Sequence, residues 1–321
     1  MFQSAITAAA PDPDSPAAFR AQIDLETNGE YARFRRTLTP AHRIVWRDLA
    51  RAYVWLAAVL AATAQAGGLV SGLIAAAVGA VALGYGIAFI QLFIHEAAHY
   101  HLAADRGLND RLANWLICWQ VGTDIASYRR THFDHHRFLG EDRDSENSYR
   151  NALTLGFILK MATGLHAVAV FAQRGSGEPA QVQRRSLRPL VRGVAGHFVL
   201  ISILLVSGGW PAALAWVGGM GVIFPLLATL RQMIEHRPVG SESPAGFAVT
   251  RLFGDDPFSR TFGGAGFNRH LLHHLEPQIS YTRLAELDSY LAGTSAAPVL
   301  AARRASYLGV CRDLLSDGRR G

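Results

Sequence analysis

The stretch from Leu69 to Ile94 is a long apolar run without a charged side chain. A helix rises about 1.5 Å per residue, so this run can cross a hydrocarbon core of roughly 30 Å. Residues 49–66 form a second apolar run that is just long enough, and Gly67 and Gly68 between the two runs mark a turn. Together the runs predict a helical hairpin in a membrane.

The composition agrees with a membrane protein, since 50% of the 321 residues are hydrophobic and only 17% are charged. Residues 189–207 and 211–230 predict a second hairpin around a Gly-Gly-Trp-Pro turn. Another apolar stretch, Leu153–Ala172, contains Lys160 and His166, so we expect an interfacial or cap helix there and not a fifth span. The predicted fold is all-α, with four transmembrane helices as two hairpins under a helical cytoplasmic cap.

One membrane domain is expected over residues 30–298. Its cap consists of residues 95–188 and 231–298, with a loop in its Gly- and Pro-containing part. Residues 1–29 lack the basic region of a signal peptide, and we expect a flexible tail there. Residues 299–321 are expected to form a basic C-terminal tail.

The formal net charge of +6 is carried by arginine, because Lys160 is the only lysine. The arginines concentrate in residues 33–51, 129–150 and 184–192. Basic clusters beside apolar spans indicate cytoplasmic flanks that face anionic lipid, and they do not suggest a nucleic-acid partner. Residues Glu30–Arg51 predict a helix that lies on the lipid headgroups.

Three histidine boxes follow the predicted hairpins. The first is His-Glu-Ala-Ala-His, and the other two share the pattern His-x-x-His-His, so on helices each box presents its imidazoles on one face. The boxes contain His95, His99, His132, His135, His136, His270, His273 and His274. Imidazole suits first-row transition metals, and eight histidines exceed the four ligands of one zinc, so two metal ions are the simplest interpretation. His236, where the last span ends, is a ninth candidate.

The order and spacing of the boxes on two hairpins resemble the membrane fatty acid desaturase superfamily. The resemblance extends from about Arg47 to Leu287 and includes the flanking sequences Tyr-Arg-Arg-Thr-His132 and His274-Leu-Glu-Pro. It implies two iron ions at the cytoplasmic surface, held by His95, His99, His132, His135, His136, His236, His270, His273 and His274. It also suggests Gln232 as a water-mediated metal contact, with Asn268 as a rival and His101 as a possible extra ligand.

Metal-bound imidazoles usually donate their second N–H to a carboxylate or a carbonyl group. The acidic residues that lie in or beside the boxes are Glu96, Asp134, Glu235 and Glu276. Three further histidines stand alone, and we expect them to be structural: His42, His166 and His197.

The resemblance implies an enzyme that uses O2 and two external electrons to introduce a double bond into a long acyl chain from the bilayer. Lipid or carotenoid hydroxylation or ketolation by the same superfamily stays open, because the position of the substrate carbon decides the outcome. The two cysteines cannot hold an iron–sulfur cluster and no second domain is evident. We therefore expect a separate electron donor of the ferredoxin, cytochrome or rubredoxin type, and the basic cap would suit an acidic one.

Two other classes compete with this interpretation. His95-Glu96-Ala-Ala-His99 also satisfies the zinc-protease pattern HExxH, in which the glutamate acts as general base. That pattern needs one further ligand and leaves both His-x-x-His-His boxes unexplained. A metal sensor or transporter is a third possibility, but transport sites usually lie near the bilayer midplane, whereas these boxes lie at span ends.

Overall fold

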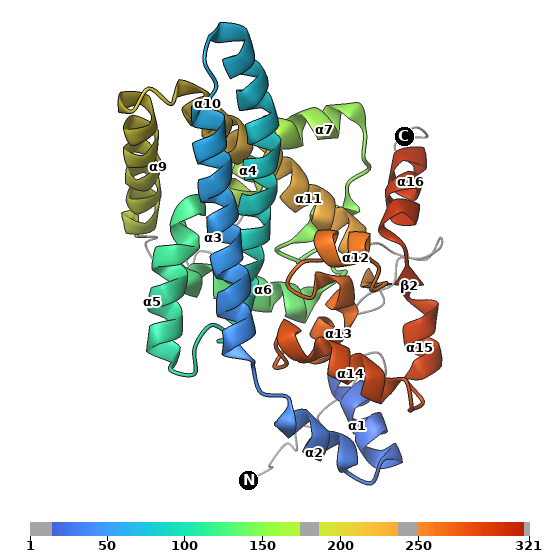
Figure 1. The fold of residues 1–321 in the computed structure, drawn as a ribbon. Helices are drawn as coiled ribbons and strands as arrows, with labels where there is room; N and C mark the ends of the chain where they lie inside the picture. Colours follow the sequence, from blue (N-terminus) through green and yellow to red (C-terminus); the bar gives the residue numbers. More distant parts are fainter. Residues whose placement is uncertain (1–14, 174–185, 237–248, 318–321) are drawn as a thin grey trace, which may run out of the picture.

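The computed structural model describes residues 15–173, 186–236 and 249–317, and this part of the protein is mainly helical (Figure 1). The α-helices are α1 (Pro16–Glu26), α2 (Glu30–Thr37), α3 (His42–Ala64), α4 (Leu69–Ala98), α5 (Arg106–Leu116), α6 (Ile125–Phe138), α7 (Leu155–Ala162), α8 (Leu165–Gln173), α9 (Arg188–Val206), α10 (Trp210–Gly218), α11 (Phe224–Glu235), α12 (Pro257–Phe262), α13 (His270–Leu275), α14 (Leu284–Leu291), α15 (Ala297–Ala302) and α16 (Tyr307–Asp317). Short helical turns are η1 (Cys118–Val121), η2 (Asn147–Arg150), η4 (Gly219–Ile223), η6 (Phe267–Arg269) and η7 (Tyr281–Arg283). The two-residue strands β1 (Leu252–Phe253) and β2 (Arg304–Ala305) pair in parallel.

Three helical units of the described chain are long and apolar enough to cross a membrane: α4, α9 and the continuous unit α10–η4–α11. The predicted spans 69–94, 189–207 and 211–230 fall on them. The predicted span 49–66 lies on α3 and is not confirmed, because α3 carries four charged residues as far as Arg51. The uncharged part of α3 after Arg51 rises only about 20 Å, which is short of a hydrocarbon core.

Helix α4 lies beside α3 and α10 (Figure 1), and glycines on α4 allow this close approach. A Cβ atom on Gly79 would lie 2.7 Å from Oγ1 of Thr63 on α3. A Cβ atom on Gly84 would lie 2.4 Å from Cβ of Ile223 in the π-helical turn η4. The predicted hairpin of the first two apolar runs is therefore present as a packed helix pair.

The apolar stretch 153–172 is divided between two short helices, α7 and α8, and does not form the single long helix that a fifth span would require. The break falls at Gly164, whose φ of 72° is accessible to glycine at little cost. Helix α7 has 8 residues and rises about 12 Å, so it cannot span a bilayer. Phe157 and Met161 are buried beside α11, while Leu155 and Leu159 are exposed.

The expectation of a flexible tail over residues 1–29 was wrong for its second half. Ser15 caps α1 by accepting a hydrogen bond from the backbone N–H of Ala18, at 3.2 Å. Phe19 and Ile23, spaced one helical turn apart, pack with the buried leucines of α13 and α14. The short apolar face of α1 thus joins the N-terminal segment to the third histidine box, and residues 1–14 lie outside the described part.

Two further expectations need correction. Residues 299–317 form the end of α15, strand β2 and α16, and not merely a tail; Tyr307, Val310 and Leu314 bury one face of α16 near α11. The helix expected over Glu30–Arg51 is broken between α2 and α3, where a proline interrupts helical hydrogen bonding. Most of the loop predicted between α8 and α9 lies outside the described residues.

Candidate metal centre

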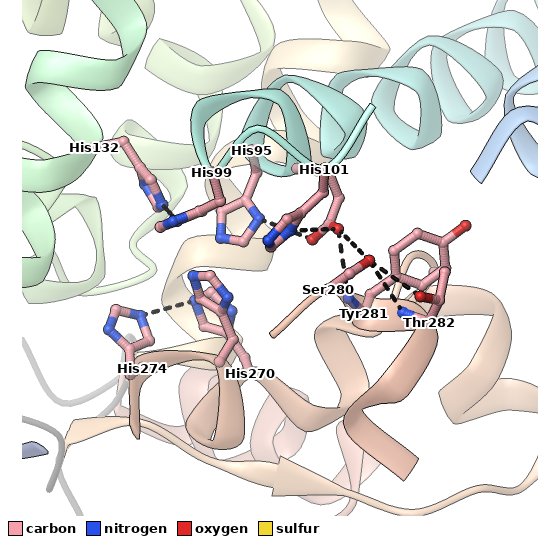
Figure 2. Close-up of polar contacts among 12 residues, drawn as sticks. His95, His99, His101, His132, His270, His274, Ser280, Tyr281 and Thr282 are labelled. Atoms are coloured by element: carbon pink, nitrogen blue, oxygen red, sulfur yellow. Dashed lines mark hydrogen bonds and ion pairs between the residues drawn. The ribbon is translucent and has the colours of Figure 1, made fainter. Parts of the chain in front are cut away.

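The three histidine boxes occupy helices that meet on one side of the long helices. The first box lies at the C-terminal end of α4, the second on α6 and the third on α13, and His236 directly follows α11. Figure 2 shows His95, His99 and His132 pointing toward His270 and His274 from the opposite side. Helix α6 is oriented from its start by Asp124, whose side chain accepts a hydrogen bond from the backbone N–H of Ser127.

All nine predicted ligands lie in two groups, within each of which the ring nitrogens are no more than 4.8 Å apart. The five-histidine group consists of His95, His99, His132, His136 and His273. The four-histidine group consists of His135, His236, His270 and His274. The second and third boxes contribute to both groups, whereas the first box contributes only to the five-histidine group. Each group offers enough ligands for one transition-metal ion.

The spacing of the ring nitrogens fits metal ligation. In the five-histidine group, Nε2 of His132 lies 3.0 Å from Nε2 of both His99 and His136. In the other group, Nε2 of His270 lies 2.9 Å from Nε2 of His236. Two imidazole nitrogens bound at right angles to one ion, each at about 2.1 Å, would be about 3.0 Å apart.

The protonation state and the unpaired atoms of the site also fit a metal. Burial lowers the pKa of His132 to about 4, with a further contribution from His95. Burial and neighbouring imidazoles also hold the pKa of His273 well below its usual value. The neutral ring is the form that binds a metal ion. Nε2 of His95 is buried and has no hydrogen-bond partner among the described residues, as expected for an atom reserved for a ligand.

Sequence reasoning missed the best carboxylate partner of the site. Oδ1 of Asp144 lies 2.8 Å from Nδ1 of His135, and both side chains are buried. The hydroxyl of Tyr149 donates to the other carboxylate oxygen of Asp144 at 2.7 Å. This arrangement fixes the ring of His135 with Nε2 free for a metal. Asp144 lies in the loop after α6, where no periodic pattern could relate it to the box.

The four acidic residues proposed from the sequence have different roles. Asp134 is exposed on α6. Glu235 pairs with Arg231, at 2.6 Å. Glu276 is fully buried and accepts a hydrogen bond from the Tyr31 hydroxyl at 2.8 Å, which ties α2 to the end of α13.

The carboxylate of Glu96, in contrast, approaches the ring of a candidate ligand. Its Oε1 atom is 3.7 Å from Nδ1 of His95. Its other oxygen, Oε2, is 3.1 Å from Nδ1 of His101.

The three further metal contacts that the resemblance suggested lie in different surroundings. Gln232 lines the same cavity as His236. The amide of Asn268 donates to the carbonyl of Gly254 and to the carboxylate of Asp255, at 3.2 and 3.1 Å. It therefore serves the neighbouring loop and not the histidines.

His101 belongs to neither group, because its ring nitrogens lie next to Glu96 and the Gln278 carbonyl. Of the isolated histidines, His197 accepts a hydrogen bond from the Trp216 indole N–H at 3.1 Å and joins α9 to α10, as a structural histidine should.

A cavity of about 1870 Å³ reaches the histidine groups. His95, His132, His135, His236 and His270 line one part of it. Apolar side chains of α4, α9 and α11 line a second part, among them Phe89, Leu190, Phe224 and Leu227, and polar side chains such as Asp124, Ser127 and Arg130 line the remainder. The cavity exceeds the roughly 300–1,000 Å³ of common small-ligand sites and one part of its wall is apolar, so it has room for a long apolar chain.

The family profile described as fatty acid desaturase matches residues 71–304, which include all nine clustered histidines. The chain belongs to the fatty acid desaturase family. None of the curated proteins matches this sequence. Membership in the desaturase family indicates an oxidoreductase, and the histidine cluster described above fits the di-iron site typical of the family.

Proposed function

We propose that this protein is a membrane di-iron desaturase that uses O2 and two external electrons to introduce a double bond into a long acyl chain. The observation that carries the proposal is the pair of histidine groups at the wall of a large, partly apolar cavity, in a chain of the desaturase family. Hydroxylation or ketolation of a lipid or carotenoid by the same centre is the alternative.

The five-histidine group and the four-histidine group would each hold one iron ion. Two irons would supply the oxidising power that removal of hydrogen from an unactivated methylene requires. Desaturation balances when the chain loses two hydrogen atoms, O2 takes up these with two electrons and two protons, and two molecules of water leave. A ferredoxin, cytochrome or rubredoxin type of donor would deliver the electrons, because the two cysteines of this sequence cannot hold an iron–sulfur cluster.

The protein's own residues bind and orient the acyl chain. Phe89 on α4 and Leu227 on α11 line the cavity together with His95 and His236. Such walls exclude water and hold one methylene segment beside the imidazoles, and this positioning selects the carbon that reacts. The regiochemistry thus depends on the depth to which the chain enters.

The membrane is the proposed source of the substrate. Ala167 on α8 and Leu190 on α9 line the cavity, and α9 exposes apolar side chains such as Phe198 and Val206. We propose a multi-pass arrangement in which α3 completes the fourth crossing and the histidine groups lie on the cytoplasmic side. The uncharged part of α3 is shorter than a hydrocarbon core, so the arginine side chains at its charged end would have to reach out to the headgroups. The arginine-rich segments beside the boxes support this sidedness.

The zinc-protease alternative finds no support in the position of Glu96. A general base must reach the reacting water in the site. Glu96 is 1% exposed, is absent from the residues that line the cavity, and accepts hydrogen bonds from the protein.

Product analysis tests the proposal. The protein would be expressed with a suitable electron donor, and total lipids would be compared by mass spectrometry with those of cells that express His135→Ala or His273→Ala. We expect a new double bond with the parent protein and none with either variant, since each variant removes a ligand from a different histidine group. A hydroxylated or ketolated product would favour the alternative, and full activity of either variant would contradict the proposal.

A further inference from the structure

We infer that Glu96 is a positioning residue, whose buried carboxylate ties the first histidine box to the segment after the third box and so maintains the five-histidine group. The inference rests on the proposed metal centre. It assigns a role to the glutamate that gives the first box its resemblance to a zinc-protease motif.

Three donors converge on one oxygen of the Glu96 carboxylate, and they belong to residues that Figure 2 labels: His101, Ser280 and Tyr281. Oε2 lies 3.1 Å from Nδ1 of His101, accepts a hydrogen bond from the Ser280 hydroxyl at 2.9 Å, and accepts one from the backbone N–H of Tyr281 at 3.4 Å. Glu96 is 1% exposed and Ser280 is fully buried. Hydrogen bonds to a buried carboxylate are among the stronger ones in proteins, so this cluster is a firm attachment.

The attached segment is also fixed by its other contacts. Nε2 of His101 lies 3.3 Å from the carbonyl oxygen of Gln278. The Tyr281 hydroxyl donates to Asp48 on α3 at 2.9 Å, and its ring meets Phe93 on α4 edge-on, with centroids 6.0 Å apart. The segment 278–281 is therefore held against the ends of α3 and α4.

This attachment bears unequally on the two histidine groups. His95 and His99 of the first box belong to the five-histidine group, together with His273 from α13. Release of the end of α4 from the segment that follows α13 would separate these ligands. The four-histidine group contains no residue of the first box. It keeps its own support from Asp144.

The test compares Glu96→Ala, Glu96→Gln, Ser280→Ala and the control Glu286→Ala in the full-length protein, purified in detergent and loaded with iron. Glu286 is about half exposed and pairs with Arg283 at the surface, outside the attachment. The measurements are iron per chain, iron affinity by chelator competition, and the electron paramagnetic resonance signal, which separates a coupled iron pair from a single iron.

Glu96→Ala is expected to retain the iron of the four-histidine group and lose the other, with the signal of an isolated iron. Ser280→Ala should lower the affinity for one of the two irons by roughly 10-fold, as loss of a hydrogen bond that supports a metal ligand does. Glu96→Gln keeps an acceptor oxygen for Ser280 and Tyr281, so it should hold both irons and retain turnover. If Glu96 were a general base, the same substitution would abolish turnover. Glu286→Ala should match the parent protein.

Two coupled irons at unchanged affinity in Glu96→Ala would overturn the inference. If Glu96→Ala does not fold, unchanged affinity for both irons in Ser280→Ala would overturn it equally. The parent protein separates this outcome from failure of the proposed function, because a parent chain without two irons contradicts the metal centre itself, whatever the variants do.

Discussion

Substitution of Asp144 tests how the four-histidine group is supported. Its carboxylate lies 2.8 Å from Nδ1 of His135, and the two side chains expose 0% and 1% of their surfaces. Loss of such a partner lowers metal affinity by roughly 10–100-fold. This corresponds to about 1.4–2.8 kcal/mol, since each factor of ten is worth about 1.4 kcal/mol. Asp144→Asn retains an oxygen acceptor and should lie near the lower limit, and Asp144→Ala near the upper one.

The assay is competition for iron with chelators of graded strength, with the iron that remains per chain measured by elemental analysis at each chelator concentration. One ion should leave at a lower chelator concentration than in the parent protein, and the other should be unaffected. Asp142→Asn is the matched control, because Asp142 lies in the same loop, is 91% exposed and pairs with Arg150. The reasoning fails if Asp144→Ala releases both ions at the chelator concentrations that the parent protein requires.

Three further results are expected. Gly84→Ala places a Cβ atom against a side chain of η4 and should lower the free energy of unfolding by about 1–3 kcal/mol. The control Gly221→Ala, whose Cβ atom would have nothing within 4 Å, should leave it unchanged. Equal thermal midpoints for the two variants would contradict the packing. Tyr31→Phe removes a hydrogen bond to buried Glu276 and should lower the free energy of unfolding in denaturant by about 1.5–3 kcal/mol, and no change would refute this. Leu227→Trp fills part of the cavity and should shorten the longest acyl chain that becomes desaturated, so an unaltered chain-length profile would exclude this wall as a limit.

The features that could be predicted from the sequence depend on local periodicity. An uncharged run such as Leu69–Ile94 has few solutions other than a buried or membrane helix. The spacing of His132, His135 and His136 forces three imidazoles onto one side of any helix. These constraints act within a single helix, so the histidine boxes and three of the four spans could be predicted from the sequence.

The division of the histidines into two groups could not be predicted from the sequence. His135 and His136 are neighbours on α6 but belong to different groups, as do His273 and His274 on α13. Which imidazole meets which depends on how α4, α6, α11 and α13 are placed relative to one another. No spacing within one helix encodes that placement.

Other differences also arise from contacts between distant segments. Asp144 reaches His135 from an irregular loop. The short apolar face of α1, formed by Phe19 and Ile23, is buried by the leucines of α13 and α14, which lie far away in the sequence. The predicted span 49–66 is not confirmed for a local reason, since Arg51 and the charged residues before it leave α3 with a short apolar part.

Metal content per chain is the most direct test of a di-iron centre. The protein would be expressed with iron and without added zinc, purified, and measured by elemental analysis together with Mössbauer spectroscopy. The two histidine groups predict two iron ions per chain in a magnetically coupled pair. One zinc ion and no iron would contradict the account and direct attention back to the first histidine box alone.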